Sequence, residues 1–372
     1  MVAPLTLDVY RTAIPMRRFE HSAAKRLKAD GIVVKLTLSN GVVGWGETHP
    51  REYVTGETLD SVPADIGEFI WPRYCNDPAA PFPLERDGRA INAAACAVEL
   101  AHLDATEGFP PGSAAGDIAG RVSGVLGSSA PARTIRQLRM MRCFGLRDFK
   151  LKLGLGEDVD RRNLAAVCER LGRAITAGKC SLRVDVNGGW DENTTPDRIA
   201  QLRANGVCAV EQPIFCQAEE LVDLARRCEL PLIADESLLT EADARRLQAL
   251  GDRIWWNIRI SKNGGFAPAK RLVEMAAGAG VPVVIGCMVG ESGILSAAQR
   301  RLLVASPRAR FIEGNYGTFL IKQDLARPSL RFGYAGRLKR LNGQSLGVVV
   351  DPNQINRYGK KCYTLKAGAA SP

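Results

Sequence analysis

The sequence lacks any uninterrupted apolar run of the roughly 18 residues that a membrane span needs. Its start, MVAPLTLDVYRT, has neither the basic nor the apolar region of a secretory signal. Ten cysteines are present, but they are scattered and form no C-x-x-C pair, which argues against a disulfide framework or a cysteine-type metal site. These absences predict a cytoplasmic protein with reduced thiols and no membrane partner.

A recognisable nucleic-acid-binding motif is also missing, although the net charge is +10. RRFEHSAAKRLK is the only densely basic segment in the 372 residues. We therefore expect no nucleic-acid partner and interpret the positive charge as suited to an anionic small molecule.

Histidine is scarce, since the chain has only His21, His49 and His102. The segment VGESG around Ser292 is close to the G-x-S-x-G of hydrolases, but no residue separates the serine from the next glycine. All three histidines precede Ser292, whereas the hydrolase fold needs a histidine after it. The sequence therefore excludes a hydrolase site at this serine.

What the sequence has instead is a repeat of short apolar strands and amphipathic helices that starts near residue 118. The strand candidates cover residues 120–127, 148–154, 181–189, 208–214, 231–237, 254–265, 281–293 and 308–317. Strict alternation of strands and helices implies a parallel sheet, and eight such units imply closure into a (β/α)8 barrel of the TIM type. The expected fold class is therefore α/β.

The first 117 residues follow a different pattern. Segments 5–14, 31–39 and 42–48 alternate like an antiparallel meander with a hairpin turn, and a helical pattern covers 89–108. We expect three parts: an α+β capping domain over 1–117, a barrel over 118–328, and a segment over 329–372 that returns to the cap and ends in a disordered tail.

Charged residues recur where the barrel strands end, and in a barrel of this type the carboxyl ends of the strands surround the active site. In chain order these positions are Lys150 and Lys152, Asp185 and Asn187, Glu211, Asp235 and Glu236, and Lys262. Each acid follows a strand of mostly apolar residues, where an unpaired carboxylate is costly to bury. Another charged group must therefore compensate these acids.

Asp185, Glu211 and Asp235 are predicted to converge on one metal ion. Hard oxygen ligands with no cysteine or histidine nearby select Mg2+, with Mn2+ as a substitute. A lysine beside another lysine and a divalent cation should have a lowered pKa, so Lys152 next to Lys150 is a candidate base.

Six motifs stand in one order and spacing along the chain: KLK, DVNGGW, EQP, ADES, KNGG and GCMVGESG. Together they resemble the enolase superfamily, specifically its muconate lactonizing enzyme subgroup. The resemblance covers nearly the whole chain, because that family also has an α+β cap completed by C-terminal residues. Enzymes of this superfamily use a lysine or histidine base together with Mg2+ on an enediolate.

The resemblance implies a role for each motif residue. Asp185, Glu211 and Asp235 would be the metal ligands. Lys152 and Lys262 would be the acid/base pair on opposite faces of the substrate. Lys150 would tune Lys152 and help to hold a substrate carboxylate.

Other residues near the mouth allow two interpretations. Asn187 and Glu236 either orient ligands or cap local structure. Ser123 on the first strand, and Cys287 and Met288 on the seventh, either line a substrate pocket or are packing residues.

The type of reaction is narrowed by what the family requires. Relatives of the mandelate racemase type use a histidine on a late strand, and this chain has none after position 102. Three reactions remain: muconate-type cycloisomerisation, o-succinylbenzoate-type dehydration, and racemisation or epimerisation of N-acyl amino acids or dipeptides. Many dipeptide epimerases carry Asp-x-Asp on the eighth strand, where this chain has Glu313-Gly314-Asn315. Cycloisomerisation is therefore the first choice, with Glu313 as a candidate substrate contact.

The resemblance implies that two cap loops, about Pro15 to Lys28 and Thr48 to Thr58, cover the mouth and contact a small anionic carboxylate substrate. The candidate contacts are Arg17, Arg18, Lys25, Arg26, Arg51 and Tyr53. The resemblance also implies a homo-oligomer. A non-catalytic binding or scaffold protein that retains the barrel site remains the alternative of another class.

Overall fold

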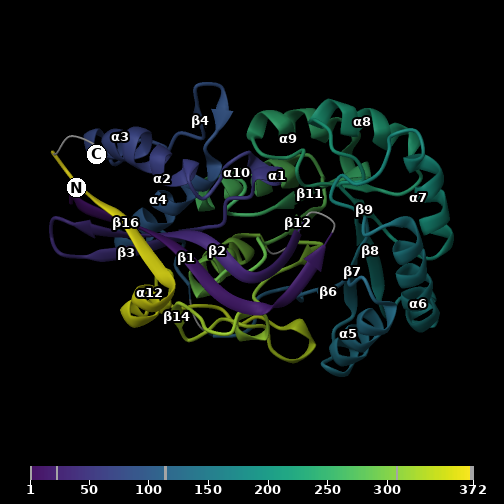
Figure 1. Cartoon of the computed structure of the whole chain (residues 1–372). Coiled ribbons are helices and arrows are strands. Elements are labelled where there is room, and N and C mark those ends of the chain that lie inside the picture. Colours follow the sequence, from purple (N-terminus) through teal and green to yellow (C-terminus); the bar gives the residue numbers. More distant parts are fainter. Residues whose placement is uncertain (1, 22–23, 113–114, 307–308, 369–372) are drawn as a thin grey trace.

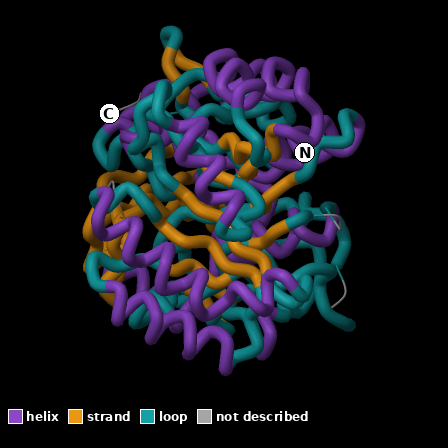
Figure 2. Tube along the Cα trace, turned by 90° about the vertical axis from the view of Figure 1, so that its right-hand side faces the viewer, coloured by secondary structure: helices purple, strands orange, loops and turns teal. Residues whose placement is uncertain are grey.

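A computed structural model of the chain describes residues 2–21, 24–112, 115–306 and 309–368. Its largest sheet has eight parallel strands in the order β13-β12-β11-β10-β9-β8-β7-β6. A parallel bridge between Val122 and Ile312 joins the two ends of this sheet. The predicted (β/α)8 barrel is confirmed (Figures 1 and 2).

The eight strands are shorter than the segments that predicted them, because the chain turns into loops soon after each carboxyl end. They are β6 Gly124–Leu126, β7 Asp148–Lys152, β8 Ser181–Asp185, β9 Val210–Glu211, β10 Leu232–Ala234, β11 Ile254–Ile258, β12 Val283–Ile285 and β13 Phe311–Ile312.

Helices cover the outside of the barrel (Figure 1). They are α5 Pro131–Cys143, α6 Glu157–Thr176, α7 Thr195–Ala204, α8 Ala218–Arg227, α9 Glu241–Leu247, α10 Phe266–Gly278 and α11 Gly293–Ala305, with the short helix η2 Gln248–Arg253 after α9. Among the described residues, no helix combines the length and the apolarity needed to traverse a bilayer.

Each barrel strand has one face toward the helices and one toward the barrel axis. On β7, Phe149 and Leu151 lie in the main hydrophobic core, whereas Lys150 and Lys152 belong to a polar interior. The apolar side chains thus hold the strand against the helices while the two lysines point inward.

A second apolar cluster fills the barrel interior below the charged layer. It contains Ala209, Ile233, Trp255, Val284 and Phe311, which lie on five neighbouring strands or, for Ala209, just before one. The Arg183 guanidinium lies 4.1 Å from the Phe311 ring and completes this floor. In barrels of this type the active site lies at the carboxyl end of the strands, above such a floor.

The cap is a four-stranded antiparallel sheet in the order β16-β1-β2-β3, packed against helix α4. Its strands are β1 Pro4–His21, β2 Ala24–Leu38, β3 Val43–Thr48 and β16 Gly359–Lys366, and α4 covers Asn92–Ala105. A Cβ at Gly44 or Gly46 would lie 2.1 or 1.9 Å from a carbonyl oxygen of α4, so both positions need glycine for this close approach.

Smaller elements complete the cap and the end of the chain. They are α1 Glu52–Thr55, α2 Ser61–Asp65, η1 Ile66–Ile70, α3 Trp71–Asn76, β4 Glu85–Arg86, β5 Arg89–Ala90, η3 Gly317–Phe319, β14 Ala326–Arg327, η4 Tyr334–Gly336, β15 Val349–Val350 and α12 Pro352–Tyr358. The last strand, β16, pairs along β1 and appears in yellow across the cap in Figure 1. The tail from residue 369 lies outside the described residues.

The cap segment predicted as a loop from Pro15 to Lys28 is instead part of a long hairpin. β1 and β2 continue through it, and Glu20 still pairs with Lys25. The backbone pairing of β1 with β2 continues beyond residue 14, where the alternation of apolar residues ends and where the first strand was predicted to stop. Residues 22 and 23 and the side chains of 18–26 lie outside the described part, so the predicted roles of Arg18, Lys25 and Arg26 remain predictions.

Candidate active site

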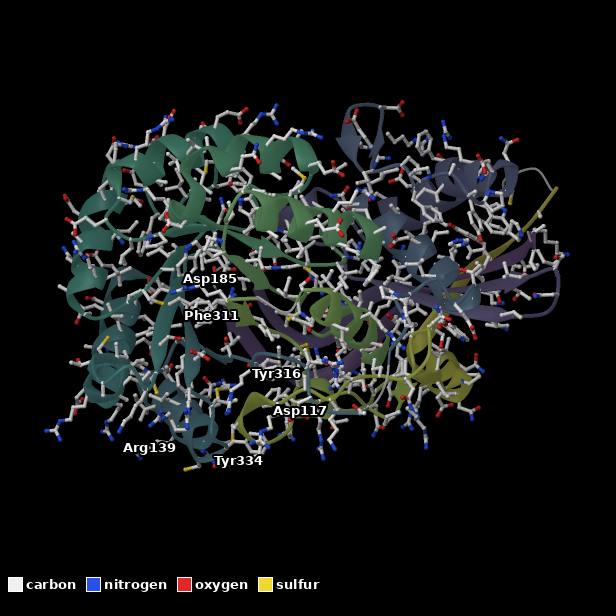
Figure 3. The ribbon with its side chains drawn as sticks, turned by 180° about the vertical axis from the view of Figure 1, so that it is seen from behind. Asp117, Arg139, Asp185, Phe311, Tyr316 and Tyr334 are labelled. Atoms are coloured by element: carbon white, nitrogen blue, oxygen red, sulfur yellow. The ribbon has the colours of Figure 1, made fainter. Side chains whose placement is uncertain are left out.

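A cavity of about 260 Å³ lies at the carboxyl end of the barrel, partly under the cap hairpin. Lys150, Lys152 and Arg259 line it from the barrel, and Arg17 lines it from β1. Figure 3 shows Asp185 within the barrel, whereas Arg139 and Tyr334 lie at the lower edge of the molecule. The cavity is where the sequence predicted a site.

Lys150 is buried among three carboxylates. Its Nζ lies 2.6 Å from Glu313 Oε2, 3.1 Å from Glu211 Oε2 and 3.2 Å from Asp185 Oδ2. Burial lowers the pKa of the Lys150 ammonium, but the charges of Glu211, Glu313 and Asp185 outweigh burial and raise it. The surrounding carboxylates thus favour the charged form of Lys150.

Lys152 is the other lysine of this strand in the cavity. Its Nζ donates to Asp185 Oδ2 at 2.5 Å and to Asn187 Oδ1 at 2.9 Å. The backbone of Asn187 has φ +49°, and its side-chain Nδ2 donates to Glu236 Oε1 at 3.3 Å. Asn187 therefore helps to fix the Lys152 ammonium in place.

The three predicted metal ligands form a row at the ends of β8, β9 and β10, and all are fully buried. Burial raises the pKa of Asp185, but Lys152 and Lys150 outweigh it and hold the pKa below its usual range. Burial and the charge of Asp185 raise the pKa of Glu211 to about 7. The three buried carboxylates repel one another, so the row needs nearby positive charge to stay ionised.

These residues offer suitable donors for a hard divalent cation, although they do not yet surround one point. Each neighbouring pair of acids contacts one positively charged side chain. Lys150 contacts Asp185 and Glu211, and Arg259 Nη2 contacts Glu211 and Asp235. Within the described ranges no three Asp, Glu, His or Cys side chains form a ready metal-binding group. Lys150 and Arg259 lie between the acids, and the assignment of Asp185, Glu211 and Asp235 as metal ligands stays a prediction.

Two further oxygens support the fit of a cation to this donor set. Asn257 Oδ1 and Glu236 Oε2 are buried beside the row and have no hydrogen-bond partner in the described part of the chain. An unpaired buried oxygen is costly, so ligation is a physical use for both. Carboxylate and amide oxygens are the ligands that Mg2+ and Mn2+ accept. The donor chemistry therefore fits a divalent cation. The Arg259 guanidinium contacts oxygens of Glu211 and Asp235 that such a cation would use.

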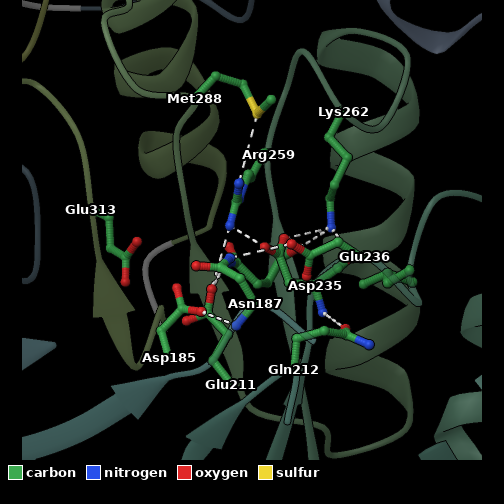
Figure 4. A network of polar contacts seen from close by, with 12 residues as sticks. Asp185, Asn187, Glu211, Gln212, Asp235, Glu236, Arg259, Lys262, Met288 and Glu313 are labelled. Carbon is green, nitrogen blue, oxygen red and sulfur yellow. Dashed lines mark hydrogen bonds and ion pairs between the residues drawn. The ribbon is translucent and has the colours of Figure 1, made fainter. Parts of the chain in front are cut away.

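Arg259, directly after β11, lines the cavity, and Lys262 lies beside it with its ammonium at Asp235 (Figure 4). Lys262 is fully buried and does not belong to the described cavity lining. Its Nζ donates to Asp235 O at 2.5 Å, Asn257 O at 2.8 Å and Asp235 Oδ1 at 3.1 Å. β11 ends at Ile258, and the turn after it directs the Lys262 ammonium toward these carbonyls and the Asp235 carboxylate. The role of Lys262 as the second acid/base group stays a prediction.

Other predicted pocket residues divide into two groups. Cys287, Met288 and Glu313 line the cavity. Glu313 accepts from Lys150 and from Arg183 at 2.6 Å each, so it fixes both cations. Ser123 is fully buried outside the described lining, where its hydroxyl accepts from Arg183 at 3.3 Å.

The second cap segment does not place its predicted contacts in the described cavity lining. Arg51 is buried, and its guanidinium donates to Pro50 O at 2.7 Å, Asp30 O at 3.1 Å and Val289 O at 3.4 Å. Arg51 thereby connects the cap to the loop after β12. Tyr53 is half-buried beside it and also lies outside the lining.

Sequence reasoning missed Arg259, Arg183 and Glu291. The first two could have been found, because inward-facing positions on a strand recur every second residue. Trp255, Asn257 and Arg259 follow this period on and just after β11. Glu291 lines the cavity from the loop after β12, where no strand period applies.

The sequence of the chain resembles those of known proteins over most of its length. The model of the family described as "Enolase C-terminal domain-like" matches residues 133–354, more than half of the chain. An L-Lys-D/L-Arg epimerase of Methylococcus capsulatus is 31% identical over 86% of this chain and 91% of its own length. A chloromuconate cycloisomerase of Cupriavidus pinatubonensis is 29% identical over 93% of this chain and 96% of its own.

Solved structures share the fold. The muconate lactonizing enzyme of Pseudomonas fluorescens, solved with muconolactone, has a TM-score of 0.79 and 24% identity over 96% of this chain and 100% of its own. The 2-chloromuconate cycloisomerase of Rhodococcus opacus 1CP has a TM-score of 0.82 and 22% identity over the same shares.

Proposed function

The chain belongs to the enolase superfamily as an isomerase, and from this premise we propose that it moves a proton at the α-carbon of a small carboxylate substrate with a divalent cation, Mg2+ or Mn2+. The observation that carries the proposal is the position of Lys152. Its ammonium is in the cavity, 2.5 Å from one acid of the predicted metal row.

Removal of an α-proton next to a carboxylate needs a base and a place for the developing negative charge. Lys152 supplies the base when neutral and the acid when charged. Lys150 and Arg259 supply fixed positive charge in the same cavity. A divalent cation bound to the acid row would add charge against the substrate carboxylate oxygens.

Muconate-type cycloisomerisation is the reaction we favour. In lactone formation, one substrate carboxylate oxygen forms a C–O bond to the diene, and the π electron pair moves toward the second carboxylate as an enolate. The Lys152 ammonium then donates one proton to the α-carbon. In reverse, the neutral amine takes that proton and the C–O bond breaks, so no oxidant or other reactant is needed.

Epimerisation is the second candidate, because an epimerase is 31% identical to the chain. The o-succinylbenzoate-type dehydration is a third use of the same proton transfer. Glu313 bears on the choice: it is held between Lys150 and Arg183, which favours an anchoring role over binding of a substrate ammonium.

The experiment is product identification from a panel of substrates. Protein, Mg2+ and D2O are incubated with cis,cis-muconate, N-succinyl amino acids, dipeptides or a succinylbenzoate precursor, and products are identified by NMR. A deuterated lactone supports cycloisomerisation, while an epimer or an alkene identifies an alternative. If no α-position takes up deuterium with any compound, the scaffold alternative gains support.

A further inference from the structure

We infer that a second cavity, at the other end of the barrel, binds a phosphate monoester with an aromatic group, which is the chemistry of a mononucleotide. This arginine pocket has a volume of about 350 Å³. Its charged and aromatic lining consists of Arg121, Arg142, Arg147, Arg337 and Tyr334. No described residue lines both the arginine pocket and the active-site cavity, so a ligand here is separate from the proposed substrate.

The arginine pocket lies at the amino end of the barrel. Arg121 comes shortly before β6, and Arg147 directly precedes β7. Arg142 belongs to the last turn of α5, the helix that connects these two strands. The active-site cavity is at the carboxyl end of the same strands, so the barrel separates the two cavities. Figure 3 shows Tyr334 at the lower edge of the molecule, away from Asp185.

The backbone that carries two of the pocket side chains is bonded to the elements that carry the others. The short helix η4 contains Tyr334 and leads directly into Arg337. Its middle residue, Ala335, donates its amide to Phe144 O, at the end of α5, at 2.8 Å. Its last residue accepts from the Val122 amide, just before β6, at 2.9 Å. These bonds hold the lining together in advance, so little ordering is needed when a ligand binds.

Two unusual backbone positions allow η4 to approach α5 this closely. Gly145 has φ +86°, and a Cβ there would lie 3.0 Å from Tyr334 Cζ and 3.1 Å from Ala335 Cβ. Ala335 itself has φ +59°, which costs free energy for a residue other than glycine. The pocket is therefore held in a shape that the local chain does not favour by itself.

The four arginines of the pocket lack an acidic partner. In the described ranges none of their guanidiniums forms an ion pair with Asp or Glu, whereas other surface arginines such as Arg161 and Arg203 do. Arg142 Nη1 donates to Cys180 Sγ at 2.5 Å, which leaves its charge uncompensated. Like charges around one cavity repel one another, and a bound anion relieves that repulsion.

Two groups of the protein itself are rivals for this positive charge. Asp148 begins β7 beside the pocket, but its Oδ1 accepts from Ser181 Oγ at 2.6 Å and it pairs with none of the four arginines. The carbonyls at the end of α5 carry partial negative charge. Three of them already accept from the backbone amides of residues 144–146 at 2.9–3.0 Å. Neither group therefore replaces an external anion.

A phosphate monoester suits this lining. A guanidinium offers paired N–H donors that match two phosphate oxygens, and it stays charged at every pH at which proteins are folded. A phosphate monoester carries about −1.5 to −2 charge at neutral pH, more than a single carboxylate. Tyr334 adds a ring that is 65% exposed, with its centroid 5.9 Å from that of Phe144. A nucleobase can stack on such a ring.

The test is calorimetry of the full chain with AMP, ribose 5-phosphate and inorganic phosphate. EDTA is present, so that no divalent cation recruits phosphate to the acid row. We expect AMP to bind most tightly, and its affinity to fall at least about tenfold between about 50 and about 500 mM NaCl, because salt screens exposed charges. Arg337→Met should weaken AMP binding at least about tenfold, since it removes a charged hydrogen-bond donor.

The matched control is Arg340→Met, because Arg340 is an exposed arginine of the same segment and lies outside the pocket lining. Its affinity for AMP should equal that of the wild type. Absence of binding by all three compounds, or AMP binding that Arg337→Met leaves unchanged, would overturn the inference.

Replacement of Tyr334 tests the aromatic part of the ligand. Tyr334→Ala should weaken AMP binding about tenfold and leave inorganic phosphate unaffected, whereas Tyr334→Phe, which keeps the ring, should retain the wild-type affinity. Equal affinities of the wild type for AMP and ribose 5-phosphate would refute the mononucleotide assignment.

Arginine labelling locates the ligand without turnover. The protein is treated with phenylglyoxal with and without AMP, and modified arginines are mapped by mass spectrometry. We expect AMP to protect Arg142 and Arg337 and to leave Arg340 reactive. Protection of Arg17 and Arg259 instead would place the phosphate in the active-site cavity and overturn the inference. A failed search for α-proton exchange would affect only the proposed function.

Discussion

Replacement of Lys262 separates a structural lysine from a catalytic one. Lys262→Met removes the charged donor from Asp235 O and Asn257 O and leaves the Asp235 carboxylate with Arg259 as its main cationic partner. A buried acceptor left unpaired costs about 1–3 kcal/mol, and a buried pair that loses one partner costs about 3–5 kcal/mol. Since Asp235 keeps Arg259, we expect a loss of about 3 kcal/mol in the free energy of unfolding.

The assay is urea unfolding followed by fluorescence and circular dichroism. With an m-value of about 3 kcal/mol/M, a loss of about 3 kcal/mol lowers the midpoint by about 1 M. Lys270→Met is the matched control, because Lys270 is a half-exposed lysine of the following helix that pairs with Glu274, and such a pair contributes at most about 0.5 kcal/mol. An unchanged midpoint for Lys262→Met, with proton exchange abolished, would refute the structural role.

Three further predictions concern the acid row, the base and the cap. Lys152→Met should lower turnover by about 10²–10⁴-fold. Because Lys152 is buried and paired with Asp185, the urea midpoint should fall as well, and turnover that stays within about tenfold of wild type in the folded variant would contradict the catalytic role. EDTA should abolish turnover and Mg2+ or Mn2+ restore it, while calorimetry should show weaker Mg2+ binding to Glu211→Gln; equal affinity would remove Glu211 from the ligand set. Burial raises the pKa of Glu99, which accepts from the Phe266 amide at 2.5 Å, to about 7. The native state therefore holds a proton that the unfolded chain releases, so stability should fall by up to about 3 kcal/mol as pH rises from about 4.5 to about 7. Glu99→Gln should flatten this fall in midpoints measured across that range, and an unchanged slope would contradict it.

The barrel could be predicted because its signals are local and repeated. Alternation on β7 placed Lys150 and Lys152 on one face, and strand ends twenty-odd residues apart placed the acids at one rim. These features depend only on strand period and barrel topology. The same period, followed through Trp255 and Asn257, leads to Arg259.

The position of Lys262 could not be predicted from its motif. KNGG follows the end of β11, where strand period no longer applies and a turn sets the direction of the side chain. The raised pKa of Lys150 depends on acids from three different strands, and the burial of Arg51 depends on contacts between cap and barrel. Such properties arise from packing between distant segments, which no local pattern records.

The most direct test of the central claim is exchange of the substrate α-proton with solvent, measured by NMR in D2O for the wild type and Lys152→Met. The account predicts that wild-type protein exchanges the α-proton of muconolactone only with Mg2+ or Mn2+ present. It also predicts that Lys152→Met, assayed without urea and shown by circular dichroism to be folded, exchanges it at least about a hundredfold more slowly. Undiminished exchange by Lys152→Met, or by wild-type protein in EDTA, would contradict it.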